Sequence, residues 1–202
     1  MTNKVNYQKM LEAEIEKIKM SGEKKRLLIH SCCAPCSSYV LEYLKDIFDI
    51  TVLYYNPNIY PAEEFFKRAD EQKSLAEKMG NVNVIVSEFD ESEFYKSVKG
   101  YEKCPEGGER CFICYRLRLE KTAIYARENG FDYFCTTLSI SPLKNAQKLN
   151  SIGAELSDKY GVSYLYSDFK KKNGYKRSIE LSKEYELYRQ DYCGCVFSKN
   201  NE

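Results

Sequence analysis

Leu27-Leu-Ile-His-Ser-Cys-Cys-Ala-Pro-Cys36 is the stretch that decides the fold of this chain. Its apolar start is typical of a buried strand, predicted at Arg26–His30, and the Ser-Cys-Cys-Ala-Pro that follows interrupts it. With Ser37 as its cap, a helix is predicted to follow and to run to about Leu44. A buried strand that leads directly into a helix predicts a parallel sheet with crossover helices.

The rest of the chain repeats this alternation of apolar runs and helical patterns. Four more strands are predicted, at Ile50–Tyr55, Val82–Val86, Tyr133–Thr137 and Val162–Tyr166. Helices are predicted at Tyr7–Met20, Pro61–Met79, Cys111–Glu128, Pro142–Tyr160 and Ile179–Tyr188, with a long irregular loop at 87–110. We therefore predict the α/β class. The prediction is a single three-layer Rossmann-like domain, 1–202, with a mostly parallel five-stranded sheet and an N-terminal helical extension at 1–24.

Length and composition narrow the class of protein. The chain has 202 residues, of which 43% are hydrophobic and 30% charged, as expected for one globular domain with a sizeable core. Its 31 basic and 30 acidic residues leave almost no net charge, so overall charge makes no case for nucleic acid. We find no export signal and no apolar run of the roughly 20 residues that span a membrane. We expect a cytoplasmic protein with free thiols and no membrane partner.

Nine cysteines gather in short clusters, which is typical of a metal centre or of redox chemistry. They are Cys32, Cys33 and Cys36; Cys104; Cys111 and Cys114; Cys135; and Cys193 and Cys195. Cys135 lies within a predicted strand and is expected in the core. The one histidine, His30, ends the first strand and is expected to be a hydrogen-bonded structural residue rather than a ligand.

Two of these pairs have the spacing of metal ligands. Cys111 and Cys114 are three residues apart at the start of a helix, which sets both sulfurs on one face and favours thiolate. Cys32 and Cys33 can reach one centre if the backbone turns where the strand ends. Four sulfurs suffice for a tetrahedral zinc or a [4Fe–4S] cluster, and spacing does not choose between them. Cys36 is placed to join as a further ligand.

Cys193-Gly-Cys195 is a different kind of pair. Glycine permits the tight turn that lets the two sulfurs meet. A disulfide here would close a very small, strained and easily reduced ring, which suits a redox-active pair. The alternative is two thiols that share a metal or lie in a tail.

Several separate motifs resemble the epoxyqueuosine reductase QueH family, the iron–sulfur family distinct from the cobalamin-dependent reductase. They follow one another in order along nearly the whole chain after the first helix. They are Leu27-Leu-Ile-His-Ser-Cys-Cys-Ala-Pro-Cys36, Tyr54-Tyr-Asn-Pro-Asn-Ile-Tyr-Pro61, Glu106-Gly-Gly-Glu-Arg-Cys-Phe-Ile-Cys-Tyr-Arg-Leu-Arg-Leu119, Thr136-Thr-Leu-Ser-Ile-Ser-Pro-Leu-Lys144, Ser167-Asp-Phe-Lys170 and Tyr188-Arg-Gln-Asp-Tyr-Cys-Gly-Cys195.

The resemblance implies a reaction. Members of the family remove the epoxide oxygen of epoxyqueuosine at the tRNA wobble position with two electrons and two protons. This gives queuosine, in the last step of that modification. By analogy, a [4Fe–4S] cluster would bind to four cysteines and Cys36 would bind a second mononuclear iron or other metal. The four are Cys32, Cys33, Cys111 and Cys114. Cys193 and Cys195 would form a redox-active disulfide, and Cys104 has no role in the pattern.

The same resemblance implies partners: a tRNA that carries epoxyqueuosine in its anticodon, and an electron donor. We expect Arg116, Arg118, Lys144 and Lys170 to contact phosphates of the anticodon stem–loop. Asp191, next to the last cysteine pair, is a candidate proton donor to the leaving oxygen.

Two alternatives remain open at this point. One is a zinc-containing RNA-binding module without redox activity, which leaves the Cys-Gly-Cys pair without a purpose. The other is an ATP-dependent tRNA thiolase-like enzyme, which predicts a phosphate-binding loop after the first strand. That position holds Cys-Cys-Ala-Pro-Cys instead.

Overall fold

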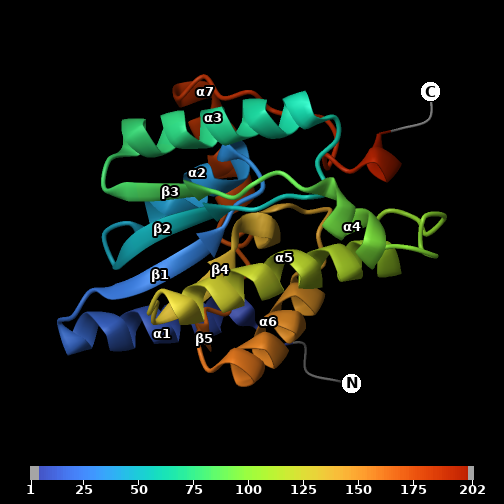
Figure 1. The fold of residues 1–202 in the computed structure, drawn as a ribbon. Coiled ribbons are helices and arrows are strands. Elements are labelled where there is room, and N and C mark those ends of the chain that lie inside the picture. Colours follow the sequence, from blue (N-terminus) through green and yellow to red (C-terminus); the bar gives the residue numbers. More distant parts are fainter. Residues whose placement is uncertain (1–4, 200–202) are drawn as a thin grey trace.

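A five-stranded parallel sheet forms the centre of the computed structural model, which describes residues 5–199. The first four and last three residues of the predicted domain 1–202 lie outside the described part. The strand order is β3-β2-β1-β4-β5, and every neighbouring pair is parallel (Figure 1). The strands are β1 (Lys25–His30), β2 (Phe48–Tyr54), β3 (Val82–Val86), β4 (Tyr133–Thr136) and β5 (Ser163–Tyr164). The predicted α/β class and the five-stranded sheet are confirmed.

Helices cover both faces of the sheet. α2 and α3 pack together on one side and α7 lies against α2, while α5 and α6 pack together on the other side (Figure 1). The helices are α1 (Tyr7–Ser21), α2 (Ala34–Leu44), α3 (Ala62–Met79), α4 (Glu91–Ser97), α5 (Glu109–Glu128), α6 (Ala146–Tyr160) and α7 (Gly174–Glu184), with short 3-10 turns η1 (Thr137–Ile140) and η2 (Val196–Ser198). The two-sided cover explains why Leu27, Leu28 and Ile29 of the central strand are fully buried.

The N-terminal helix is part of the main core. Its apolar face, at Leu11, Ile15 and Ile18, is buried in the same hydrophobic cluster as β1 and β2. This is the amphipathic pattern that the sequence predicts for the region. Gly22 ends the helix with φ +71°, the left-handed conformation that glycine adopts without cost.

The start of α2 differs from the prediction in a way that matters for the site. The helix begins at Ala34, with Cys33 as its cap and Pro35 in its first turn. Ser37 is not the cap: its hydroxyl lies inside the helix and donates to the Ala34 carbonyl oxygen and to Gln72. Proline fits a first turn because the missing N–H has no partner there. Cys36 therefore lies in the first turn of the helix.

Other element boundaries also differ. Within the predicted loop 87–110 lies the short α4, capped by the Asp90 side chain. α6 begins at Ala146 rather than Pro142, because the Asn145 side chain accepts the Lys148 N–H and caps it. α7 starts earlier than predicted, at Gly174, and β5 is only two residues long.

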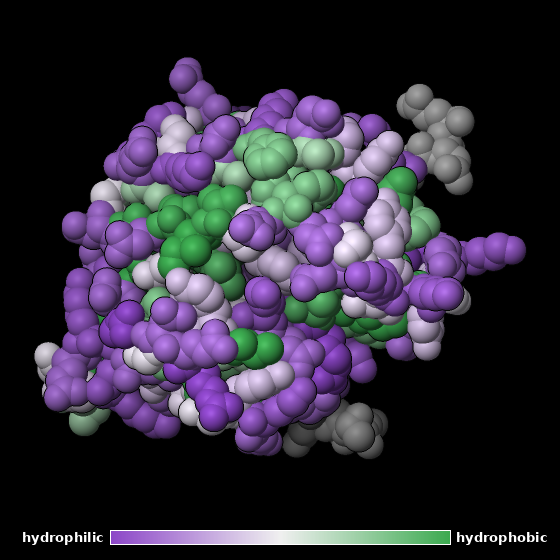
Figure 2. All heavy atoms as spheres, in the orientation of Figure 1, coloured by the Kyte–Doolittle hydropathy of each residue, from purple (hydrophilic) through white to green (hydrophobic). Residues whose placement is uncertain are grey.

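The outer surface is mostly polar on the face shown in Figure 2. Apolar side chains gather there below α3, where the edge strand β3 is only partly covered. Among the described helices, none combines the length and apolar character needed to cross a bilayer.

The sheet topology positions the functional residues. The order 3-2-1-4-5 reverses between β1 and β4, and in open α/β sheets ligands bind beyond the carboxyl ends of the strands at such a point. His30 ends β1 and pairs there with Thr136 of β4. The clustered cysteines follow directly after His30.

Candidate metal and thiol site

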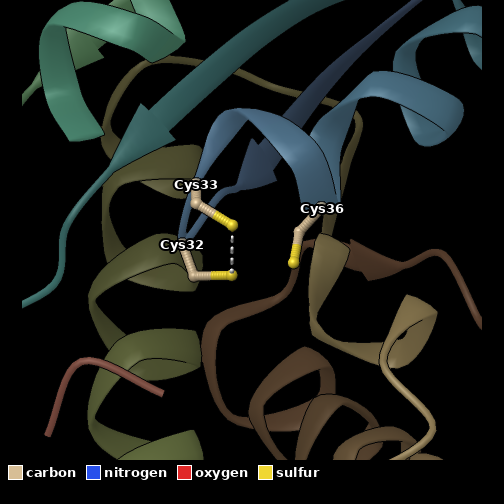
Figure 3. A group of neighbouring side chains, drawn as sticks. All are labelled: Cys32, Cys33 and Cys36. Carbon is tan, nitrogen blue, oxygen red and sulfur yellow. Dashed lines mark hydrogen bonds between the residues drawn. The ribbon is translucent and has the colours of Figure 1, made fainter. Parts of the chain in front are cut away.

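Three cysteine sulfurs converge immediately after β1. The Sγ atoms of Cys32, Cys33 and Cys36 all lie within 4.8 Å of one another, and those of Cys32 and Cys33 are 3.8 Å apart. Figure 3 shows the side chains of Cys32 and Cys33 extending in the same direction, toward Cys36 at the start of α2. The structure thus brings Cys36 into the group.

Hydrogen bonds to the backbone and to Gln72 hold this loop in place. The Ser31 N–H continues the sheet by donating to the Leu53 carbonyl oxygen, and Asn56 donates to the Ser31 carbonyl oxygen at 2.8 Å. The hydroxyls of Ser31 and Ser37 both donate to Oε1 of Gln72, at 2.7 and 2.8 Å. β1 itself ends at His30. The prediction that Cys32 and Cys33 both face one centre requires such an end of the strand.

The three thiols interact electrostatically. Hydrogen bonds from Cys33 and then Cys36 hold the pKa of Cys32 well below its usual value. The same contacts raise the pKa of Cys33 and of Cys36, because a second negative charge so close to Cys32 is unfavourable. The partial positive charge at the N-terminus of α2 further favours an anionic sulfur here. The group therefore attracts a cation.

This donor set fits a thiolate-bound metal. Two thiolates on one tetrahedral ion, with bonds of about 2.3 Å, lie about 3.8 Å apart. All-sulfur donors suit zinc and iron–sulfur centres rather than magnesium or calcium. Gln190 lies next to these donors and reaches the Cys33 Sγ with Nε2 at 2.7 Å.

Cys111 and Cys114 lie at the start of α5, as predicted, but not among these three sulfurs. The Gly107 N–H donates to the Cys111 Sγ at 3.2 Å, and burial raises the pKa of Cys114 to about 12. Both residues line a small cavity together with Cys193 and Cys195. That Cys111 and Cys114 share a centre with Cys32 and Cys33 stays a prediction.

The Cys193-Gly194-Cys195 turn depends on its glycine. Gly194 has φ +102°, and a Cβ at this position would lie 3.0 Å from both Arg68 and Ile59. The Gly194 carbonyl oxygen accepts the Tyr60 N–H at 2.8 Å, which holds the turn against the loop after β2. The predicted need for glycine is confirmed. Both cysteines are free thiols in this structure, and Cys195 is buried.

The two thiol groups open onto one cavity of about 430 Å³. Cys32 and Cys36 line this cavity, and Cys193 lines it as well. Asp191, the candidate proton donor, is exposed at the same cavity. The other lining residues are Pro35, Glu106, Arg118, Leu138, Ile140, Ser141, Leu143, Lys144, Tyr175, Ser178, Arg189, Gln190, Tyr192 and Ser198.

Two of the predicted phosphate contacts line this cavity instead of the outer surface. Arg118 is 1% exposed, and the Lys144 Nζ donates to the Cys193 Sγ at 3.0 Å and to Glu106 at 3.2 Å. The charged groups of both are buried, and their contact with phosphates stays a prediction. Arg116 pairs with Glu155 and Lys170 with Asp168 near the surface, and their phosphate contacts stay predictions.

The surroundings of Lys144 favour its charged form. Burial alone would lower its pKa, but the nearby Cys193 and Tyr115 raise the pKa above its usual value. The sequence places Lys144 at the correct edge of the sheet, but it does not predict the contact with Cys193. Gln190 was missed altogether, since an amide next to a cysteine motif carries no distinctive signal.

The expected roles of Cys135 and His30 are confirmed. Cys135 is fully buried in the core. His30 is fully buried, with Nε2 3.1 Å from the Tyr55 carbonyl oxygen and Nδ1 2.9 Å from the Thr136 hydroxyl. A carbonyl can only accept, so Nε2 carries the proton and the hydroxyl donates to Nδ1. Burial, with the positive charge of Arg118, lowers the pKa of His30 to about 4.

His30 should make the stability of the metal-free protein fall as the solution becomes acidic. Its pKa falls from 6.5 to about 4 on folding, so the unfolded chain binds a proton first as pH decreases. The free energy of unfolding should drop by about 3 kcal/mol between pH 6.5 and 4 from this residue. Urea unfolding at a series of pH values would measure this slope.

The matched control is His30→Gln, which keeps a hydrogen-bonding side chain but does not titrate. Its stability should change less steeply with pH over the same interval. Equal slopes for both proteins would contradict the assignment to His30.

Comparisons with known proteins agree with the geometry. The sequence profile of a family described as "Epoxyqueuosine reductase QueH" matches residues 27–201. A protein of that name from Staphylococcus epidermidis is 44% identical over 202 residues, which is 96% of this chain and 85% of the relative. One from Streptococcus pyogenes is 44% identical over 96% of this chain and 78% of its own length. One from Thermotoga maritima is 40% identical over 85% of this chain and 89% of its own.

Proposed function

The chain belongs to the epoxyqueuosine reductase QueH family, and on that basis we propose that it reduces epoxyqueuosine in tRNA to queuosine. The substrate would be the modified wobble nucleotide of an anticodon, and the reaction would remove its epoxide oxygen. The observation that carries the proposal is the cavity that Cys32 and Cys36 line together with Cys193 of the Cys193-Gly-Cys195 pair.

We propose that the metal centre is a [4Fe–4S] cluster held by Cys32, Cys33, Cys111 and Cys114. Cys36 would then bind a second mononuclear iron or other metal. The support is the family membership, together with the convergence of the Cys32, Cys33 and Cys36 sulfurs after β1. When bound, such a cluster supplies electrons one at a time.

Cys193, which lines this cavity, and Cys195 beyond Gly194 would form the two-electron store. Oxidation of the two thiols to a disulfide releases two electrons and two protons. Conversion of an epoxide to an alkene and water consumes two electrons and two protons, so the step balances. An electron donor must then reduce the disulfide. The Lys144 ammonium, 3.0 Å from the Cys193 Sγ, stabilises negative charge on that sulfur, and we retain Asp191 as the proposed proton donor at the cavity rim.

Two measurements on protein purified without oxygen test the proposal. The first is iron and acid-labile sulfide content with the visible spectrum, and the second is conversion of tRNA that carries epoxyqueuosine. About four irons and four sulfides per chain, with queuosine formed, would support it. One zinc per chain, no sulfide and no turnover after cluster reconstitution would refute it and favour the zinc-containing RNA-binding module.

Arg116 and Lys170 are the predicted phosphate contacts that remain near the surface. Arg116→Gln and Lys170→Gln should each weaken tRNA binding. Each should also reduce the slope of log affinity against log salt by about 1, because one phosphate contact is lost. Binding titrations at several salt concentrations measure both effects.

The control variant is Lys25→Gln. Lys25 begins β1 and therefore lies at the amino edge of the sheet, opposite the cavity. Its replacement should leave the affinity and the salt slope unchanged. If all three variants bind tRNA like the parent protein, Arg116 and Lys170 do not contact phosphate.

A further inference from the structure

Arg118 is a buried cation without a carboxylate partner. It is 1% exposed, and its Nε donates to the Cys114 carbonyl oxygen at 3.1 Å. Within residues 5–199, no Asp or Glu forms an ion pair with it, and the charges that act on it most come from cysteine and tyrosine. Its side chain borders both the main cavity and the small cavity beside Cys111 and Cys114.

A buried guanidinium needs an anionic partner close to it. Arginine is almost never fully buried unless it is paired, because removal of a charge from water costs several kcal/mol. The equally buried Arg68 follows this rule, because it lies 2.6 Å from Glu64. No Asp or Glu among residues 5–199 pairs with Arg118 in this way, so a different anionic group must balance its charge.

The groups around Arg118 identify that partner. Arg118 lines the main cavity together with Cys32 and Cys193, and it lines the small cavity together with Cys111 and Cys114. These sulfurs come from three separate segments: the start of α5, the C-terminal tail and the loop after β1. Arg118 therefore lies where the fields of both cysteine groups overlap, and its natural counter-charge is a set of thiolates.

We propose that Arg118 is the buried counter-cation of the thiolate-bound metal centre and that it favours the reduced form of that centre. This inference rests on the proposed function, because it requires a redox-active metal bound to these sulfurs. A metal held by thiolates carries negative charge, and each added electron makes it more negative. A fixed positive charge in a dry site stabilises the reduced form more than the oxidised form, which raises the reduction potential.

The test compares reduction potentials of loaded protein by a spectroscopic redox titration. Arg118→Met removes the charge and keeps an apolar side chain, whereas Arg118→Lys keeps the charge. Arg116→Met is the matched control, since it removes the same charge from the same helix but at an exposed position. We expect the equilibrium constant for one-electron reduction to fall at least tenfold in Arg118→Met, a potential lower by 59 mV. Arg118→Lys and Arg116→Met should stay close to the parent protein.

An unchanged potential in Arg118→Met would overturn the inference and leave the proposed function intact. A parent protein that binds no redox-active metal would overturn both. If Arg118→Met binds no metal, the iron content of Arg118→Lys decides. Retention of iron in Arg118→Lys supports the need for charge, and equal loss in both variants refutes it.

Discussion

Cys193→Ser is expected to lower the turnover of tRNA that carries epoxyqueuosine by at least about 10³-fold while the iron content stays unchanged. A serine cannot form a disulfide, so the pair loses its capacity to hold two electrons. Cys193 lies on the cavity but outside the three converging sulfurs after β1, so its loss should not disturb metal binding. Single-turnover assays and iron analysis on the same preparation measure both quantities.

Cys104→Ser is the matched control. Cys104 is another half-buried free thiol, and no role in the site is assigned to it. This variant should keep both turnover and iron. Full activity in Cys193→Ser would show that the Cys-Gly-Cys pair does not carry the electrons, and loss of iron would make Cys193 a metal ligand.

Cys111→Ala and Cys36→Ala should remove different metals from the site. If the cluster ligands are those that the family resemblance implies, Cys111→Ala removes one of four. Iron should then fall from about four to below about one per chain, with loss of the brown colour. Cys36→Ala should keep the four irons and four sulfides and lose only a second metal. Iron and sulfide analysis with the visible spectrum separates the two variants.

The reverse result would be equally informative. The structure places Cys36, and not Cys111, with Cys32 and Cys33. Loss of all metal in Cys36→Ala, with normal content in Cys111→Ala, would mean that a single ion bound by these three sulfurs is the native centre.

Much of the fold could be predicted because the informative residues act locally. The apolar run at 27–29 and Gly80 after α3 mark a buried strand and a helix end in short windows of sequence. Val82–Val86 matches its predicted strand at both ends. One boundary that failed depends on a side-chain cap: Asn145 caps α6, although Pro142 is the stronger signal in the sequence.

The site was less predictable, because distant segments decide its chemistry. The cysteine clusters could be identified from spacing, but the burial of Arg118 and Lys144 could not. Both look like surface cations in the sequence, and only the packing of α5 and of the η1–α6 loop against the cavity turns them inward. Lys144 meets Cys193 across 49 positions, which no short-range pattern can reveal.

The residues on the two sides of the site lie far apart in the sequence, so the ribosome makes them at different times. Cys33 and Gln190 meet in the finished structure, yet they are 157 positions apart. Cys32, Cys33 and Cys36 leave the ribosome well before Cys193 and Cys195 are made. A nascent chain can therefore present the three converging thiols long before it can form the proposed Cys193/Cys195 redox pair, whose turn is held against the loop after β2.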